Sequence, residues 1–185
     1  RDAFYDGFTL STGARLSRHE THVHFVAAGA KADIASAALV SGSRHSDFTS
    51  EVLHIGERCE TRQRHKGVAR DKGRNVFQGK FHVKRSAQKT DARMNADALL
   101  LSDAAEANHK PELEIYADDV QCAHGSTAGA LDENAIFYMR QRGLSDAQAR
   151  AMLIEAFVAG VFDGVAHPGI AQVFHHRIRK WLETE

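Results

Sequence analysis

Cys122 and His124 are the two residues of this sequence that could together bind a metal ion or act in catalysis. They lie in "VQCAHGSTAG", residues 120–129, and the chain has only one other cysteine, Cys59. If this stretch is an extended strand, the two side chains share one face, about 6.6 to 6.8 Å apart along the strand. A thiolate and an imidazole bind zinc or iron, which normally take about four ligands. The strand therefore predicts at most half of a metal site, with Cys122 and His124 as candidate metal and cofactor ligands.

The other ligands of such a site could come from this chain or from another chain. His82 and His109 are candidates within the chain, although spacing alone does not place them. A single C-x-H motif is equally compatible with a small buried thiol beside an incidental histidine. Nucleophilic catalysis by a Cys–His pair needs hydrogen-bond contact and a third, orienting group, which neighbours on one strand face provide poorly. No catalytic residue is predicted.

The composition excludes several classes of function. The 24 Lys and Arg residues balance the 24 Asp and Glu residues, so no general attraction to nucleic acid or an anionic membrane is expected. No stretch reaches the roughly 20 apolar residues of a membrane span, and nothing resembles a secretory leader. The sequence contains no glycine-rich loop followed by lysine, so no nucleotide-binding site is predicted. Cys59 and Cys122 are predicted to be free thiols in a reducing compartment, with the cytoplasm as the expected location.

Residues 20 to about 128 have the pattern of many short strands. In "NVFQGKFHV", residues 75–83, apolar and polar residues alternate, which predicts a half-buried strand with His82 on its polar face. Further strands are expected in the segments 21–28, 32–40, 46–56, 95–102 and 113–125. The predicted core residues are Phe77, Phe81, Leu99, Leu100, Leu101, Leu113 and Ile115. Short strands without intervening helices predict a mainly β fold.

Beyond Gly129 the pattern becomes helical. Asp132 can cap a helix over 133–142 that ends at Gly143, and Ser145 with Gln148 forms a capping box for a second helix. The apolar stripe of the second helix extends to residue 165 and consists of Ala147, Ala151, Ile154, Val158, Val161 and Val165. After a break at Pro168 and Gly169, a last helix carries Ile170, Phe174, Ile178 and Trp181 on one face. The stripes could pack on the strands or be offered in part to a partner protein.

The sequence resembles SufD-type members of the SufB/SufD family of the SUF iron–sulfur cluster assembly system, in their C-terminal part. The resemblance rests on "PELEIYADDV", on the "HG" that follows Cys122, and on "FYMRQRG", residues 137–143. Upstream, "GRNVFQGKFHV" and "AQKTDARMNADALLLS" extend it over residues 45–165. It implies a right-handed parallel β-helix followed by a small helical domain. We assign residues 1–130 to the β-helix, truncated at its N-terminus, and residues 131–185 to the helical domain.

The resemblance also implies a function. It suggests a non-catalytic scaffold subunit that pairs with a SufB-like subunit through the β-helix and docks a SufC-like ATPase through its C-terminal helices. His124 aligns with the histidine that the family places at the junction of the two subunits, and Cys122 occupies the neighbouring position. A transient iron–sulfur cluster or iron is then expected at the interface, with the thiol and the imidazole presented outward at the seam.

Two other functions are compatible with the residues alone. One is a β-helix enzyme acting on carbohydrate, although acidic pairs such as Asp118 and Asp119 are scattered without an aromatic platform. The other is a simple metal-binding protein that uses the 12 histidines. When the chain is isolated, pairing with a second copy is also expected, because an open β-helix edge can accept another strand.

Overall fold

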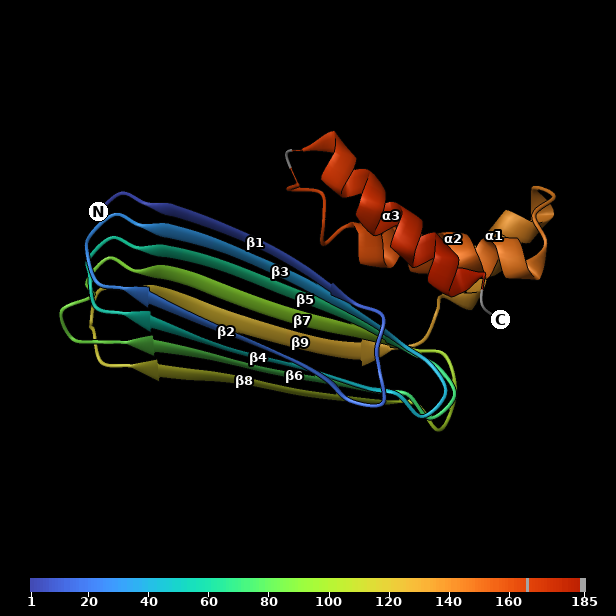
Figure 1. The fold of residues 1–185 in the computed structure, drawn as a ribbon, viewed down its shortest axis with the longest axis horizontal. Coiled ribbons are helices and arrows are strands. Elements are labelled where there is room, and N and C mark those ends of the chain that lie inside the picture. The colour runs from blue at the N-terminus through green and yellow to red at the C-terminus, as the bar shows by residue number, and fades with distance from the viewer. Residues whose placement is uncertain (166, 184–185) are drawn as a thin grey trace.

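The protein is a coil of β-strands followed by three helices. The computed structural model describes residues 1–165 and 167–183 (Figure 1). Within these residues the strands are β1 (Phe4–Ser11), β2 (Ser17–Phe25), β3 (Lys31–Val40), β4 (His45–His54), β5 (Glu60–Ala69), β6 (Arg74–Val83), β7 (Asp91–Leu100), β8 (Glu106–Ile115) and β9 (Gln121–Gly129). The helices are α1 (Glu133–Gln141), α2 (Asp146–Ala159) and α3 (Pro168–Leu182).

The strands form two parallel sheets that face each other. The odd-numbered strands make one sheet, in the order β1-β3-β5-β7-β9, and the even-numbered strands make the other, in the order β2-β4-β6-β8. The chain crosses from one sheet to the other after every strand, so each turn of the coil adds one strand to each sheet (Figure 1). Lys31 pairs with Phe4, and Glu106 pairs with Arg74, so a turn takes about 30 residues. This parallel β-helix confirms the predicted fold class.

The inner faces of the two sheets form the core. Phe77 and Phe81 are buried as predicted, and they pack with Phe25, Phe48 and Val52 in one cluster. Leu99, Leu100, Leu101 and Leu113 are only partly buried. Ile115 is 40% exposed, contrary to the prediction, because β8 is the last strand of its sheet and no further turn covers it.

Two strands, β1 and β5, were not predicted from the sequence, and the single strand predicted over 113–125 is wrong, because this segment covers the end of β8, a break at 116–120 and the start of β9. In β5, the sequence "ETRQRHKGVA" shows no apolar alternation, because its inward positions include Thr61, Gln63 and His65. All three are buried and hydrogen-bonded to polar partners in the coil. The interior of the coil is therefore partly polar, and polar residues at inward positions hid the strand from hydrophobic-pattern analysis.

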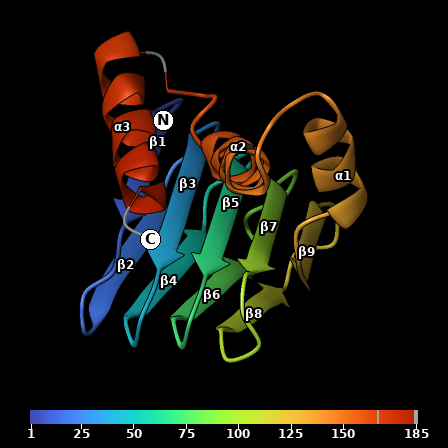
Figure 2. The same ribbon diagram turned by 90° about the vertical axis from the view of Figure 1, so that its right-hand side faces the viewer.

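The helices cover one end of the odd-numbered sheet. Ala35, Ala37 and Leu39 on the outer face of β3 pack against a cluster that includes Ile154, Val158, Val161, Ile178 and Trp181. In Figure 2, α2 and α3 lie over this sheet and α1 lies on the side of β9. Most of the apolar stripes of α2 and α3 thus pack on the strands, as one of the two interpretations of the sequence expected.

The helix boundaries differ from the prediction in two places. α2 ends at Ala159 instead of continuing to 165, because Gly160 and Gly164 favour a turn, in which Val161 and Phe162 are still buried. α3 begins at Pro168, which suits the first helical position, where proline needs no backbone partner. Ala147 and Ile170, predicted on the packed faces, are exposed, and Ala149 is buried instead of Ala147.

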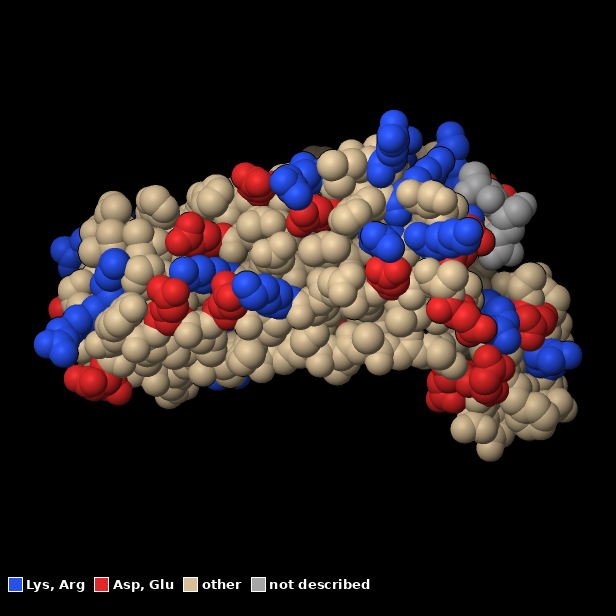
Figure 3. Space-filling view, turned by 90° about the horizontal axis from the view of Figure 1, so that it is seen from below, with Lys and Arg blue, Asp and Glu red and all other residues tan. Residues whose placement is uncertain are grey.

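The outer surface of the coil carries mixed charge. Basic and acidic side chains are interspersed along the face that Figure 3 shows. Oppositely charged residues pair on neighbouring strands, as in Arg62–Asp91 at 2.6 Å and Arg64–Asp33 at 2.8 Å. No described helix is long and apolar enough to cross a membrane.

Candidate functional site

Cys122 and His124 lie on the inner face of β9, at the open end of the coil. They pair in register with Ala92 and Met94 of β7, which are both buried and face the interior. The prediction that the two side chains share one face is therefore supported by the register. The expectation that they point outward was wrong, because they occupy inward positions. They remain accessible because no strand follows β9 in the sheet (Figure 2).

Cys122 is half-buried and reduced. It packs against two apolar clusters of the coil, one of which includes Leu113 as a partly buried member. Burial raises the pKa of the Cys122 thiol, and nearby Asp91 adds to the effect, while a hydrogen bond involving the Ala92 backbone opposes it. At neutral pH the thiol is therefore protonated, and binding a metal ion would release its proton.

His124 is exposed and has no polar partner among the described residues. Its nearest neighbours along the inner face of β9 are Cys122 and Ser126, two positions away on either side. Neither nitrogen of its ring is engaged in a hydrogen bond with the described part of the chain. The imidazole is thus free to bind an ion or a group that approaches the open end.

The structure separates the two additional histidine candidates. His109 occupies an inward position of β8, in register with Phe77, and its Nδ1 lies 3.0 Å from Ser126 Oγ on β9. His82 faces outward on β6, where its ring lies 5.6 Å from that of Tyr116 and its Nδ1 lies 3.8 Å from Glu114. Only His109 is therefore at the open end with Cys122 and His124.

The described residues do not complete a metal site. Within 1–165 and 167–183, no three His, Cys, Asp or Glu side chains are placed so that they could hold an ion together. Cys122 and His124 supply two donors of the kinds that iron accepts, a thiolate and an imidazole, and they supply them at an open edge. Two donors are fewer than the roughly four ligands that zinc or iron normally takes.

The family model for the SufBD core domain, described as SUF system FeS cluster assembly, matches residues 1–157. The chain belongs to the SufBD family. It is 38% identical over 180 residues to the iron–sulfur cluster assembly protein SufD of Escherichia coli (strain K12), covering 97% of this chain and 42% of that protein. It is 36% identical over 156 residues to a SufBD family protein of Synechocystis, covering 84% of this chain and 34% of that protein. The chain spans less than half the length of these relatives.

Cys59, the second cysteine of this SufBD chain, packs inside the coil. Cys59 is fully buried just before β5, and its Sγ donates to the backbone carbonyl oxygen of Ala27 at 3.4 Å. Neither Cys59 nor Cys122 forms a disulfide, as the sequence predicted. Cys59 therefore packs inside a turn of the coil, apart from the open end.

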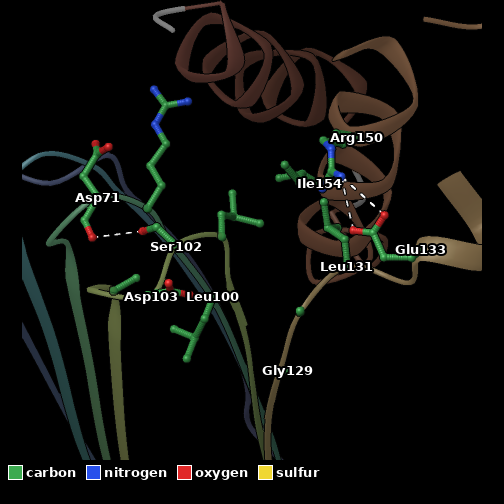
Figure 4. A pocket seen from close by; sticks show the side chains of 13 residues that line it. Asp71, Leu100, Ser102, Asp103, Gly129, Leu131, Glu133, Arg150 and Ile154 are labelled. Carbon is green, nitrogen blue, oxygen red and sulfur yellow. Dashed lines mark hydrogen bonds and ion pairs between the residues drawn. The ribbon is translucent and has the colours of Figure 1, made fainter. Parts of the chain in front are cut away.

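A second concave region of the SufBD chain lies where the strands end and the helices begin. This groove has a volume of about 680 Å³ and is bordered by the loops after β5 and β7 and by α1 and α2 (Figure 4). Arg150 is held there by Glu133 at 3.2 Å and by Asp146 at 2.7 Å, and Ser102 donates to the Asp71 backbone carbonyl. Arg150, Glu133 and Asp146 are thus paired with one another, and the described residues that line the groove include no cysteine or histidine.

Proposed function

We propose that this chain is a non-catalytic scaffold subunit for iron–sulfur cluster assembly, and that it contributes half of a cluster site to a pair of subunits. The observation that carries the proposal is the position of Cys122 and His124 on the inner face of the terminal strand β9. A second coil placed against this end would face both side chains. A transient cluster or iron at the junction is then the cargo of the complex, held by donors from two chains.

The open end of the coil also supports strand pairing with a SufB-like subunit. β8 and β9 each pair on one side only, with β6 and β7. Their other edges carry unpaired backbone N–H and C=O groups, which favour the addition of strands from another chain. In this proposal a related SufBD coil adds its strands to these edges, and a second copy of this chain does so when the partner is missing.

The helices support the docking of a SufC-like ATPase. Large apolar side chains remain exposed on all three helices, including Phe137 and Tyr138 on α1, Met152 on α2 and Val173 on α3. Exposed apolar surface of this kind favours a protein partner. In this proposal the ATPase supplies the nucleotide chemistry and this chain binds no nucleotide, and the two free thiols are kept reduced in the cytoplasm.

Co-purification tests the division between coil and helices. The chain is expressed with SufB-like and SufC-like partners, either intact or cut after Ala130, and the subunits retained are identified. We expect the shortened chain to keep the SufB-like subunit and to lose only the ATPase. Retention of the ATPase, or loss of both partners from a folded coil, contradicts the proposed docking sites. The family match favours this function over carbohydrate chemistry and over simple metal storage.

A further inference from the structure

His109 joins the two terminal strands of the coil. It lies on β8 in the even-numbered sheet, and Ser126 lies on β9 in the odd-numbered sheet. Their side chains meet across the interior, with 3.0 Å between His109 Nδ1 and Ser126 Oγ. Among the described residues, this is the one side-chain hydrogen bond between β8 and β9.

The other side of the His109 ring is anchored in the buried interior. Its Nε2 lies 3.5 Å from Nδ2 of Asn75, a fully buried residue of β6. The amide of Asn75 also lies 3.2 Å from His65 Nε2, and His65 Nδ1 lies 2.9 Å from Ser36 Oγ. A line of hydrogen-bonded side chains thus runs from β3 through the interior to β9.

The polar contacts are consistent with one state of the His109 ring. Asn75 Nδ2 can only donate, so His109 Nε2 accepts and Nδ1–H is the donor of the neutral ring, with Ser126 Oγ at 3.0 Å and a further hydrogen bond to the backbone of Ala96 on β7. Burial lowers the pKa of His109, and this outweighs the opposing effects of the Ala96 backbone hydrogen bond and of nearby Asp97, so the ring is neutral at neutral pH. The ring also contacts Phe77 edge to face, with 6.2 Å between the ring centroids, which further restricts its orientation.

The anchored ring acts on the strand that carries the candidate site. Ser126 is two residues from His124 and occupies the same face of β9. β9 pairs with a strand on one side only, so its position relative to β8 depends on side-chain contacts across the interior. We propose that His109 is a positioning residue, which fixes β9 through Ser126 and so holds His124 and Cys122 in place at the open end. This inference rests on the proposed function.

The first test measures the position of β9 without reference to cluster assembly. Peptide-resolved alkylation of Cys122 by iodoacetamide is followed in the full chain for His109→Leu, Ser126→Ala and the double variant. Loss of one neutral hydrogen bond should raise the alkylation rate about fivefold. The double variant should react no faster than the faster single variant, because both changes remove the same contact. Ser102→Ala, which removes a hydrogen bond in a distant turn, is the control and should leave the rate unchanged.

Rescue by a conservative variant separates positioning from general packing. His109→Asn keeps a donor at the place of Nδ1, so it should restore the slow alkylation of Cys122, whereas His109→Leu, of similar size, should not. Equal rates for the native chain and His109→Leu, with the fold intact by circular dichroism, would overturn the inference. So would equal rates for His109→Asn and His109→Leu.

The second test asks whether the hydrogen bond between His109 and Ser126 matters for function in the assembled complex. His109→Leu should lower the iron content of the complex, and His109→Asn should retain most of it. If His124→Ala keeps its iron, the proposed function fails while the alkylation result still decides whether His109 holds β9. If His124→Ala loses its iron but His109→Leu retains it despite a loosened β9, the positioning role is contradicted and the proposed function stands.

Discussion

Asn75 occupies the space that a side chain on Gly67 would need. A Cβ built on Gly67 would overlap the Asn75 amide, which lies between β5 and β6 in the interior of the coil. The missing side chain on β5 therefore makes room for the amide that contacts both His65 and His109. A small residue and a buried polar residue are matched across the two sheets, and this match supports the line of side chains that leads to β9.

Gly67→Ala should destabilise the coil by about 1 to 3 kcal/mol, because the added methyl group displaces Asn75 in a tightly packed interior. Urea unfolding measures the free energy of unfolding directly. Gly129→Ala is the matched control, since a Cβ at Gly129 meets no atom within 4 Å. Equal stability of the two variants would show that the Gly67 site can relax around a side chain.

The buried histidines predict an acid-sensitive fold. Burial lowers the pKa of His54 to about 4 and that of His65 to about 3, from an ordinary value of 6.5. The unfolded chain therefore takes up protons near pH 6.5 that the folded chain does not accept, and stability falls as the pH decreases from about 6.5 to about 4 for His54 and to about 3 for His65. For His54 the loss amounts to about 3 kcal/mol.

Unfolding free energies between pH 7 and pH 4 check this prediction. His54→Gln, which keeps a hydrogen-bonding group for Thr61 but does not titrate, should reduce the pH dependence, whereas His24→Gln at an exposed position should leave it unchanged. An unchanged slope in His54→Gln would mean that other groups cause the acid sensitivity.

The thiol of Cys122 should react slowly at neutral pH. Burial raises its pKa, so the thiolate fraction is small, and the rate of alkylation should keep rising above pH 9, the ordinary pKa of a thiol. Peptide-resolved alkylation across pH 7 to 10 gives the titration curve. A curve that levels off below pH 9 would contradict the raised pKa.

The cap of α2 predicts a local change in stability. Ser145 accepts from the Gln148 backbone N–H at 3.2 Å, and Gln148 accepts from the Ser145 backbone N–H at 2.9 Å. Ser145→Ala should cost about 1 kcal/mol. Hydrogen exchange should increase in the first turn of α2 and remain unchanged in β3 to β7, and faster exchange throughout the coil would show that the helices and the coil open together.

The sequence predicted those parts of the fold that follow local rules. Alternation in residues 75–83 identified β6, and the Ser145–Gln148 capping box identified the start of α2. β5 was missed because Thr61, Gln63 and His65 are polar at inward positions, and their hydrogen-bond partners come from other strands far away in the sequence. Analysis of the hydrophobic pattern does not detect a strand whose inward residues are polar.

The sequence predicted the pair of candidate site residues but not the direction in which they point or the reason for their accessibility. The spacing of Cys122 and His124 placed them on one face, and the resemblance supplied a role. The direction of that face depends on the register with Ala92 and Met94, and the accessibility depends on β9 being the last strand of its sheet. The contact between His109 and Ser126 joins strands in different sheets, and no sequence spacing indicates it.

The most direct measurement of the central claim is the iron and acid-labile sulfide content of the complex assembled with SufB-like and SufC-like partners, compared between the native chain and His124→Ala. His124 is exposed and has no described polar partner, so the variant should fold and assemble normally. We predict that the assembled variant complex loses its cluster. A variant complex that retains native amounts of iron and sulfide would contradict the claim that the open end of this coil supplies half of the site.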